Sequence, residues 1–192
     1  AGVIPSRWGS TRFPGKSLAL IGGKPLLAWV VERARQARRL DVILVATDDE
    51  RIAAAARAVG ADAVMTRADH PSGTDRIAEA IQGISADVVV NIQGDEPLIN
   101  PVLIDQIAAV LADEEAWDMA TAAAPIRSVE ELHNPDVVKV VRAQDGRALY
   151  FSRSVIPFVR GAEFPLAPVP GAHFRHIGIY GYRRKFLEAL VR

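Results

Sequence analysis

Short apolar runs of strand length alternate with longer helical patterns through the first two thirds of the chain. Residues 42–47 are a continuous apolar run, as expected for a strand that is covered on both faces, and residues 88–92 predict another buried strand. Residues 25–39, 49–59 and 101–111 place apolar side chains at helical spacing. This β-α-β-α order predicts an α/β fold, with a mostly parallel central sheet and helices on both faces.

The pattern changes after residue 137. Residues 137–141 and 149–152 are rich in strand-forming residues and flank Asp145-Gly146, which is a hairpin signal. Residues 158–173 are rich in Pro, Gly and Ala and predict a loop, and residues 186–192 predict an amphipathic helix. We therefore expect an annex that contains a β-hairpin at the C-terminal end of the α/β part.

Composition excludes several classes of protein. The 192 residues include 23 basic and 23 acidic side chains, and this zero net charge argues against a nucleic-acid partner. Without cysteine, the chain has no disulfide, thiolate nucleophile or cysteine zinc site. No apolar run approaches the roughly 18 residues that a bilayer-spanning helix needs. These features predict a cytoplasmic protein with no membrane partner.

The loop that follows the first strand is rich in cations and glycine. Residues 7–16 hold Arg7, Arg12 and Lys16 together with two glycines, whose flexibility lets backbone amides face an anion. The end of this loop is similar to an ATPase P-loop, but Ser10 stands where that motif needs its first glycine. The residues alone leave two interpretations open, a polyphosphate site and a solvated basic turn.

An acidic pair follows the strand at residues 88–92. Asp95 and Glu96 come directly after Gly94, which removes bulk near them. Magnesium in proteins is commonly held by one or two carboxylates together with phosphate oxygens and water. The alternative is a solvated turn ahead of the helix that starts at Pro101.

Three further groups of polar residues have mainly structural interpretations. Ser72 or Thr74 caps the next helix or reads a base edge, and capping is favoured. The pair Asp48-Asp49 is likewise better explained by capping than by cation binding. His173 and His176 have metal-like spacing on a helix, but on a strand they would face opposite sides, which argues against a zinc site.

Seven segments, taken in order, resemble the signature of the nucleotide-sugar cytidylyltransferases. The resemblance covers essentially the whole chain and is strongest to the members that act on the acid sugar 3-deoxy-manno-octulosonate (KDO). It implies a Rossmann-like nucleotidyltransferase fold, a homodimer and dependence on Mg²⁺. The matching segments are residues 4–16, 45–48, 70–76, 91–97, 137–141, 148–153 and 176–180.

The resemblance also implies a reaction. CTP and KDO give CMP-KDO and pyrophosphate, a step of lipopolysaccharide biosynthesis in the cytoplasm. Two alternatives stay open: a cytidylyltransferase for a related acid sugar (an amino-KDO or a sialic acid), and a nucleotide-binding module without catalysis.

Site residues follow from the same resemblance, position by position. The implied catalytic residues are Lys16, Arg7 and Asp95, and Asp95 is also the implied metal ligand. Arg153, His176 and Tyr180 match positions near the sugar, and the role of Arg76 is left open. The implied CTP-binding residues are Arg7, Ser10, Arg12, Lys16, Ser72, Gly73, Thr74 and Gln93.

One nucleotidyltransferase domain is expected over residues 1–192. Residues 1–125 form its CTP-binding α/β part, and residues 126–192 form its sugar-binding and dimerisation part. The family carries a second acidic metal ligand in a Val-Asp-Thr-Pro-like motif near its carboxyl end, and the chain stops at Arg192 without it. We therefore expect the chain to be a fragment of a longer protein.

Overall fold

The structure is a computed structural model that describes residues 1–9, 13–161 and 166–191. It divides into two compact units. The first unit comprises Ala1–Ala120 and Ile179–Arg192, and the second comprises Thr121–Gly178. The expected division into CTP-binding and sugar-binding parts concerns ligands, so it stays a prediction.

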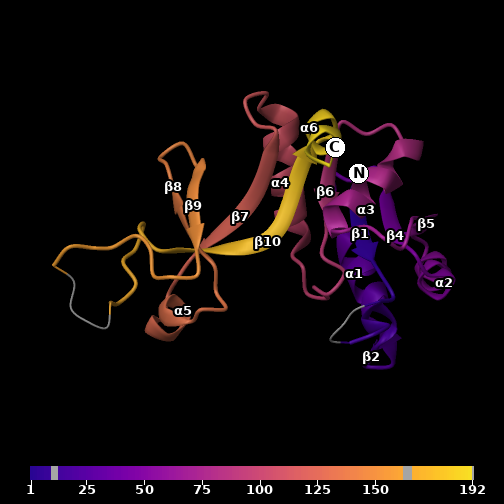
Figure 1. Cartoon of the computed structure of the whole chain (residues 1–192), viewed down its shortest axis with the longest axis horizontal. Coiled ribbons are helices and arrows are strands. Elements are labelled where there is room, and N and C mark those ends of the chain that lie inside the picture. Colours follow the sequence, from indigo (N-terminus) through magenta and orange to yellow (C-terminus); the bar gives the residue numbers. More distant parts are fainter. Residues whose placement is uncertain (10–12, 162–165, 192) are drawn as a thin grey trace. The chain divides into compact units, whose positions relative to one another are not determined.

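The sheet of the first unit has the strand order β5-β4-β1-β6-β10 (Figure 1). The pairs β1–β4, β1–β6 and β4–β5 are parallel, and β10 pairs antiparallel with β6. The predicted mostly parallel sheet is therefore confirmed. The strands are β1 (Gly2–Ser6), β4 (Ile43–Thr47), β5 (Asp62–Met65), β6 (Val88–Asn91) and β10 (Phe174–Arg183).

Three helices of this unit begin at side-chain caps, and the sequence predicts two of these, at Asp49 and Ser72. Asp49, Ser72 and Asn100 each accept a hydrogen bond from a main-chain amide in the first turn of the helix that follows. The helices are α1 (Leu26–Ala34), α2 (Glu50–Ala58), α3 (Gly73–Ala80), α4 (Pro101–Asp113) and α6 (Arg184–Leu190). Short elements are η1 (Lys16–Leu18), η2 (Ile81–Gly83) and the small hairpin β2 (Leu20–Ile21) with β3 (Lys24–Pro25).

Helix α1 ends earlier than its pattern predicts. The periodicity continues to Arg39, but the helix stops at Ala34. The main-chain amides of Arg38 and Arg39 both donate to one carboxylate oxygen of Asp105 in α4, at 2.8 Å each. These tertiary bonds hold the chain out of the helix, and a single-segment pattern does not contain them.

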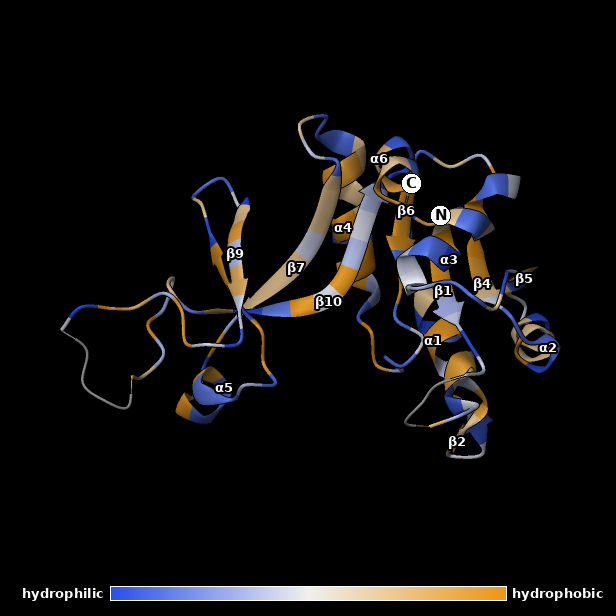
Figure 2. Cartoon of the chain, in the orientation of Figure 1, coloured by the Kyte–Doolittle hydropathy of each residue, from blue (hydrophilic) through white to orange (hydrophobic). Residues whose placement is uncertain are grey.

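Helices cover both faces of the central sheet. On one face, Val3, Leu44 and Val89 form a core cluster with residues of α3 and with Tyr182 and Leu187. On the other, Gly181 of β10 faces α4. A Cβ at Gly181 would lie 2.5 Å from Ile107 and 2.8 Å from Leu111. The central strands β4 and β6 are accordingly mainly hydrophobic (Figure 2).

The second unit contains the predicted hairpin. Strands β8 (Lys139–Arg142) and β9 (Ala148–Ser152) pair antiparallel around Gly146, whose φ of 92° lies in the left-handed region. The first part of β10 pairs with β8. Strand β7 (Met119–Pro125) leads into this unit and pairs with β10, and α5 (Val129–His133) follows it. In the described part of the chain, none of the helices has the length and hydropathy of a membrane-spanning segment.

Candidate active site

The loops that follow β1 and β6 meet at the carboxyl ends of these two strands. Nζ of Lys16 donates to Oδ2 of Asp95 at 2.6 Å, although the two residues are 79 positions apart. Both side chains keep access to solvent, at 41% and 49% exposure. The structure thus brings together the cation and the carboxylate that the sequence singles out.

Trp8 organises the loop after β1. The amide of Gly15 donates to the Trp8 carbonyl at 3.0 Å, and a Cβ at Gly15 would lie 2.8 Å from the indole ring. The φ of 67° at Gly15 is also a value that glycine tolerates best. The Trp8 ring also lies 3.3 Å from the guanidinium of Arg51, and the main-chain amide of Trp8 donates to Asp48 at 3.1 Å.

A buried hydroxyl pair anchors Lys16 to β1. Ser17 follows Lys16 in η1, and its Oγ lies 2.5 Å from Oγ of Ser6 at the end of β1. Both serines are buried, so this hydrogen bond fixes the main chain beside Lys16. Of the other predicted phosphate ligands in this loop, Arg7 is exposed, whereas Ser10 and Arg12 lie outside the described residues.

Gly94 allows the loop after β6 to approach β1 closely. A Cβ at Gly94 would lie 3.2 Å from the Pro5 carbonyl and 3.5 Å from Ile4. This contact places Asp95 next to the end of β1. The following residue, Glu96, has its pKa raised by burial and then by the charge of Asp95.

The carboxylates here suit a magnesium ion that takes most of its ligands from elsewhere. The described residues contain no cluster of three or more His, Cys, Asp or Glu that could hold a metal on its own. Asp95 nevertheless offers a half-exposed carboxylate beside a cation that can bind phosphate. One carboxylate with phosphate oxygens and water is a common magnesium arrangement, so the residues present fit that ion.

The start of α3 lies beside the same end of β1. Oγ of Ser72 accepts from the amides of Thr74 and Asp75 at 3.2 and 3.3 Å, so the predicted cap is confirmed. A Cβ at Gly73 would lie 3.4 Å from Pro5. Base reading by residues 72–74 stays a prediction, as does the role of Gln93, whose Nε2 donates to Asn91 at 3.4 Å.

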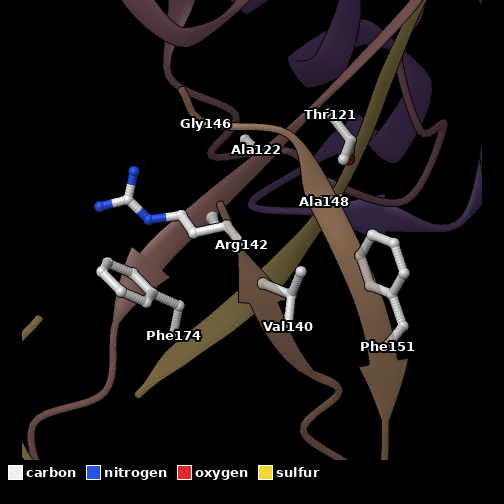
Figure 3. A pocket seen from close by; sticks show the side chains of 9 residues that line it. Thr121, Ala122, Val140, Arg142, Gly146, Ala148, Phe151 and Phe174 are labelled. Carbon is white, nitrogen blue, oxygen red and sulfur yellow. The ribbon is translucent and has the colours of Figure 1, made fainter. Parts of the chain in front are cut away.

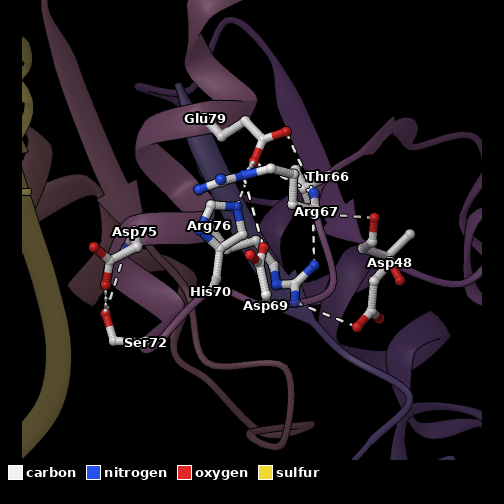
Figure 4. A network of polar contacts seen from close by, with 10 residues as sticks. Asp48, Thr66, Arg67, Asp69, His70, Ser72, Asp75, Arg76 and Glu79 are labelled. Atoms are coloured by element: carbon white, nitrogen blue, oxygen red, sulfur yellow. Dashed lines mark hydrogen bonds and ion pairs between the residues drawn. The ribbon is translucent and has the colours of Figure 1, made fainter.

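Arg76 has a role that the sequence did not reveal. Its side chain is 3% exposed, and it donates to Thr66 at 2.6 Å and pairs with Asp48 at 3.4 Å (Figure 4). Arg76 therefore ties α3 to the ends of β4 and β5. On the same helix, Glu79 accepts from the Arg67 amide and bonds His70, which fixes the loop before α3. The strand-end position of Asp48 is the one signal in the sequence for this network.

The predicted sugar residues fall into both units. Arg153 and His176 belong to the second unit, and Tyr180 belongs to the first. The side chain of Arg153 is 64% exposed, and its guanidinium donates to the Pro135 carbonyl at 2.7 Å. Tyr180 stacks with Tyr182, with ring centroids 6.4 Å apart, so its ring also packs within β10.

His176 is partly buried inside the second unit. Its Nε2 lies 2.9 Å from Oγ1 of Thr121, and the Phe151 ring meets its imidazole edge-on at 5.2 Å. Burial lowers the pKa of His176, which favours a neutral ring. A neutral imidazole can donate and accept one hydrogen bond each, which suits the hydroxyls of a sugar.

A cavity of about 270 Å³ lies next to these partners of His176 (Figure 3). Its walls are mainly small and apolar, and the charged group among them, Arg142, lies over the Phe174 ring at 4.3 Å. Such walls offer few hydrogen bonds to a polyhydroxylated sugar. The lining residues are Thr121, Ala122, Ala123, Val140, Arg142, Gly146, Ala148, Phe151 and Phe174.

Comparison with known proteins identifies the family. Residues 1–192 match the sequence model of a family described as Cytidylyltransferase. This chain belongs to the cytidylyltransferase family. This match confirms the resemblance to the cytidylyltransferases that the seven segments indicate.

Curated relatives of this cytidylyltransferase share about half of its residues. The 3-deoxy-manno-octulosonate cytidylyltransferase of Pseudomonas fluorescens is 52% identical, over 98% of this chain and 76% of its own length. The enzyme of that name from Bdellovibrio bacteriovorus is 51% identical, over 97% of this chain and 75% of its own length.

Solved structures confirm the fold. A CMP:2-keto-3-deoxy-manno-octonic acid synthetase complexed with CTP has a TM-score of 0.90 and 44% identity, over 98% of this chain and 76% of its own. A cytidylyltransferase from Leptospira borgpetersenii has a TM-score of 0.63 over 98% of this chain and 62% of its own. At 19% identity it supports the fold alone. The expected Rossmann-like α/β nucleotidyltransferase fold is therefore confirmed.

Proposed function

We propose that this cytidylyltransferase transfers CMP from CTP to the anomeric hydroxyl of KDO, with release of pyrophosphate. The observation that carries the proposal is the Lys16–Asp95 pair at the carboxyl end of β1. It lies in a chain that is about half identical to relatives named for this reaction. The product serves lipopolysaccharide biosynthesis, and a cytoplasmic location stays a prediction from the resemblance.

In the proposed mechanism the sugar hydroxyl attacks the α-phosphate of CTP. Lys16 binds the phosphates and offsets the negative charge that builds on the leaving pyrophosphate. Arg7 and Arg12 add charge from the same loop, whose two ends are joined by the hydrogen bond between Gly15 and Trp8. A magnesium ion on Asp95, when bound, supplies Lewis acidity toward the phosphate and the attacking hydroxyl.

The nucleobase and the sugar are assigned to different residues. Ser72, Gly73 and Thr74 at the start of α3, together with Gln93, are proposed to read cytosine. The guanidinium of Arg153 pairs with the carboxylate of the acid sugar, because a fork of N–H donors matches a carboxylate in two bonds. His176 and Tyr180 are proposed to bind sugar hydroxyls.

A homodimer is the proposed assembly. Strand β9 ends the strand order of the second unit and exposes Leu149, Tyr150 and Phe151 at 57%, 63% and 42%. Three large apolar side chains in a row on an edge strand favour pairing with another chain. Light scattering after size exclusion should give twice the monomer mass, and Tyr150→Lys should shift it toward the monomer.

The experiment that tests the reaction is pyrophosphate release from CTP and Mg²⁺, with KDO, an amino-KDO or a sialic acid as the acceptor. We expect release with KDO. If pyrophosphate is released with another acid sugar and not with KDO, that sugar is the acceptor instead of KDO. CTP binding without release for every sugar would make the protein a nucleotide-binding module. UTP in place of CTP serves as the matched control for base reading.

A further inference from the structure

Lys139 in the second unit is a fully buried cation that the proposed mechanism does not use. Its exposure is 0%, and it lies on β8, which pairs with β9 on one side and with β10 on the other. Its Nζ donates to three main-chain carbonyls, those of Asn134 at 2.8 Å, Val137 at 2.9 Å and Arg153 at 2.8 Å. A buried lysine with such partners needs a reason, because burying an ammonium is costly.

Three carbonyl acceptors suit the ammonium form of Lys139. An ammonium has three N–H donors and no lone pair, so each donor meets one carbonyl. A neutral amine would direct its lone pair at one of these oxygens. Burial, followed by the charge of Arg153, lowers the pKa of Lys139, whereas the three acceptors favour the charged form.

The carbonyls that bind Lys139 connect Arg153 to a neighbouring segment of the chain. One belongs to Arg153 itself, and the other two belong to residues 134–137. The guanidinium of Arg153 donates to Pro135 of that same segment at 2.7 Å and lies 4.0 Å from Asp136. Lys139 therefore fixes the main chain of Arg153 and also the segment against which its side chain rests.

The strand that carries Lys139 also aligns His176. Lys139 is in register with Ser152 of β9 on one side and with Arg175 of β10 on the other. The amide of His176 donates to the Val138 carbonyl at 2.8 Å. Both residues of this unit that are assigned to the sugar are thus attached to β8 next to Lys139.

We propose that Lys139 is a positioning residue for the acid sugar, which orients the guanidinium of Arg153 toward the sugar carboxylate. The inference rests on the proposed function of Arg153. It predicts that loss of Lys139 raises KM for KDO, because Arg153 is no longer held in place. KM for CTP stays unchanged, because the residues assigned to CTP belong to the first unit.

The test is a double-mutant cycle on turnover of CTP and KDO with Lys139→Met, Arg153→Met and the double variant. We expect each single change to raise KM for KDO on the order of tenfold or more, the effect of losing one charge-assisted hydrogen bond. KM for CTP should not change. In the double variant kcat/KM for KDO should be no lower than in Arg153→Met, because both changes remove one interaction.

Lys24→Met is the matched control, since Lys24 pairs with Glu32 and lies over Trp29 in the first unit. It should leave KM for KDO unchanged. Where Lys139→Met does not fold, as shown by circular dichroism and loss of CTP binding, the cycle is run with Lys139→Gln, whose amide still donates two bonds.

Each other result overturns a different statement. If the wild-type chain releases no pyrophosphate with KDO, the proposed function fails. An unchanged KM for KDO in Arg153→Met removes Arg153 from the sugar site, and the positioning role of Lys139 with it. If Arg153→Met raises KM but the two effects multiply in the double variant, or KM for CTP rises as well, Lys139 does not act through Arg153.

Discussion

At the scale of single residues, the candidate site depends on two charges that the chain brings together from distant positions. Lys16 comes from the loop after β1 and Asp95 from the loop after β6. The residue next to each charge holds it in place. Ser17, which follows Lys16, is buried and bonds Ser6, and Gly94, which precedes Asp95, packs closely against Pro5. The side chains of Lys16 and Asp95 remain half exposed, so a change there should alter chemistry more than folding.

Lys16→Ala should lower kcat/KM for CTP by about 30-fold to 1,000-fold, which corresponds to ~2–4 kcal/mol for one preorganised charge. The physical reason is that the developing charge on pyrophosphate loses a fixed cation. Steady-state pyrophosphate release measures it, with Lys24→Ala as the control lysine. A catalytic efficiency within about twofold of wild type would remove Lys16 from the mechanism.

Asp95→Ala should abolish turnover while the fold survives. The carboxylate is proposed to hold the metal, and no buried partner is lost because the side chain is half exposed. Circular dichroism and the melting temperature check the fold, and pyrophosphate release checks turnover. An intact protein with a near-normal rate would contradict the metal role.

The sequence predicts charged residues of the candidate site better than the residues that support them. Lys16 and Asp95 stand in motifs whose residue types match phosphate and magnesium chemistry. Arg76 and Lys139 look like ordinary helix and strand cations in the sequence, because their burial depends on how the surrounding loops fold over them. No local pattern specifies which carbonyls will surround a lysine.

At the scale of secondary structure, the sequence predicts strands and helix caps closely but does not predict every helix end. Strands β4 and β6 lie within one residue of the strands expected at residues 42–47 and 88–92, since apolar runs of this length are typical of strands covered on both faces. Asp49 and Ser72 cap helices as expected. Helix α1 is shorter than its periodicity because Asp105 binds the amides after it.

Strand β10 offers a matched pair of glycine substitutions. Gly181→Ala should lower the free energy of unfolding by about 1–3 kcal/mol, because its methyl would overpack Ile107 and Leu111. At Gly178 on the same strand, no atom of the described residues lies within 4 Å of the place that a Cβ would take. Gly178→Ala should therefore have a far smaller effect. Urea denaturation compares the two, and equal effects would mean that general strand propensity, not packing, decides.

At the scale of the whole molecule, stability should depend on pH through His176. Its folded pKa is lowered by burial, so the unfolded chain binds more protons as pH falls through the ordinary value. The free energy of unfolding is therefore unaffected by this titration above pH ~6.5, and it falls as the pH drops below that value. Wild type should therefore lose more stability between about pH 7.5 and pH 5.5 than His176→Gln does. Thermal melts at both pH values measure this, and equal losses would contradict it.

The division into two units has a consequence for how such a chain can change over evolution. Thr121–Gly178 enters through β7 and leaves through β10, and these two strands pair with each other. Because the strands at the two ends of this segment are paired, a segment of different length can replace it without moving those strands. Arg153 and His176, two of the residues proposed to bind the sugar, lie in this segment. A replacement would therefore change the proposed acceptor site and keep the loops after β1 and β6, with the phosphate chemistry proposed for them.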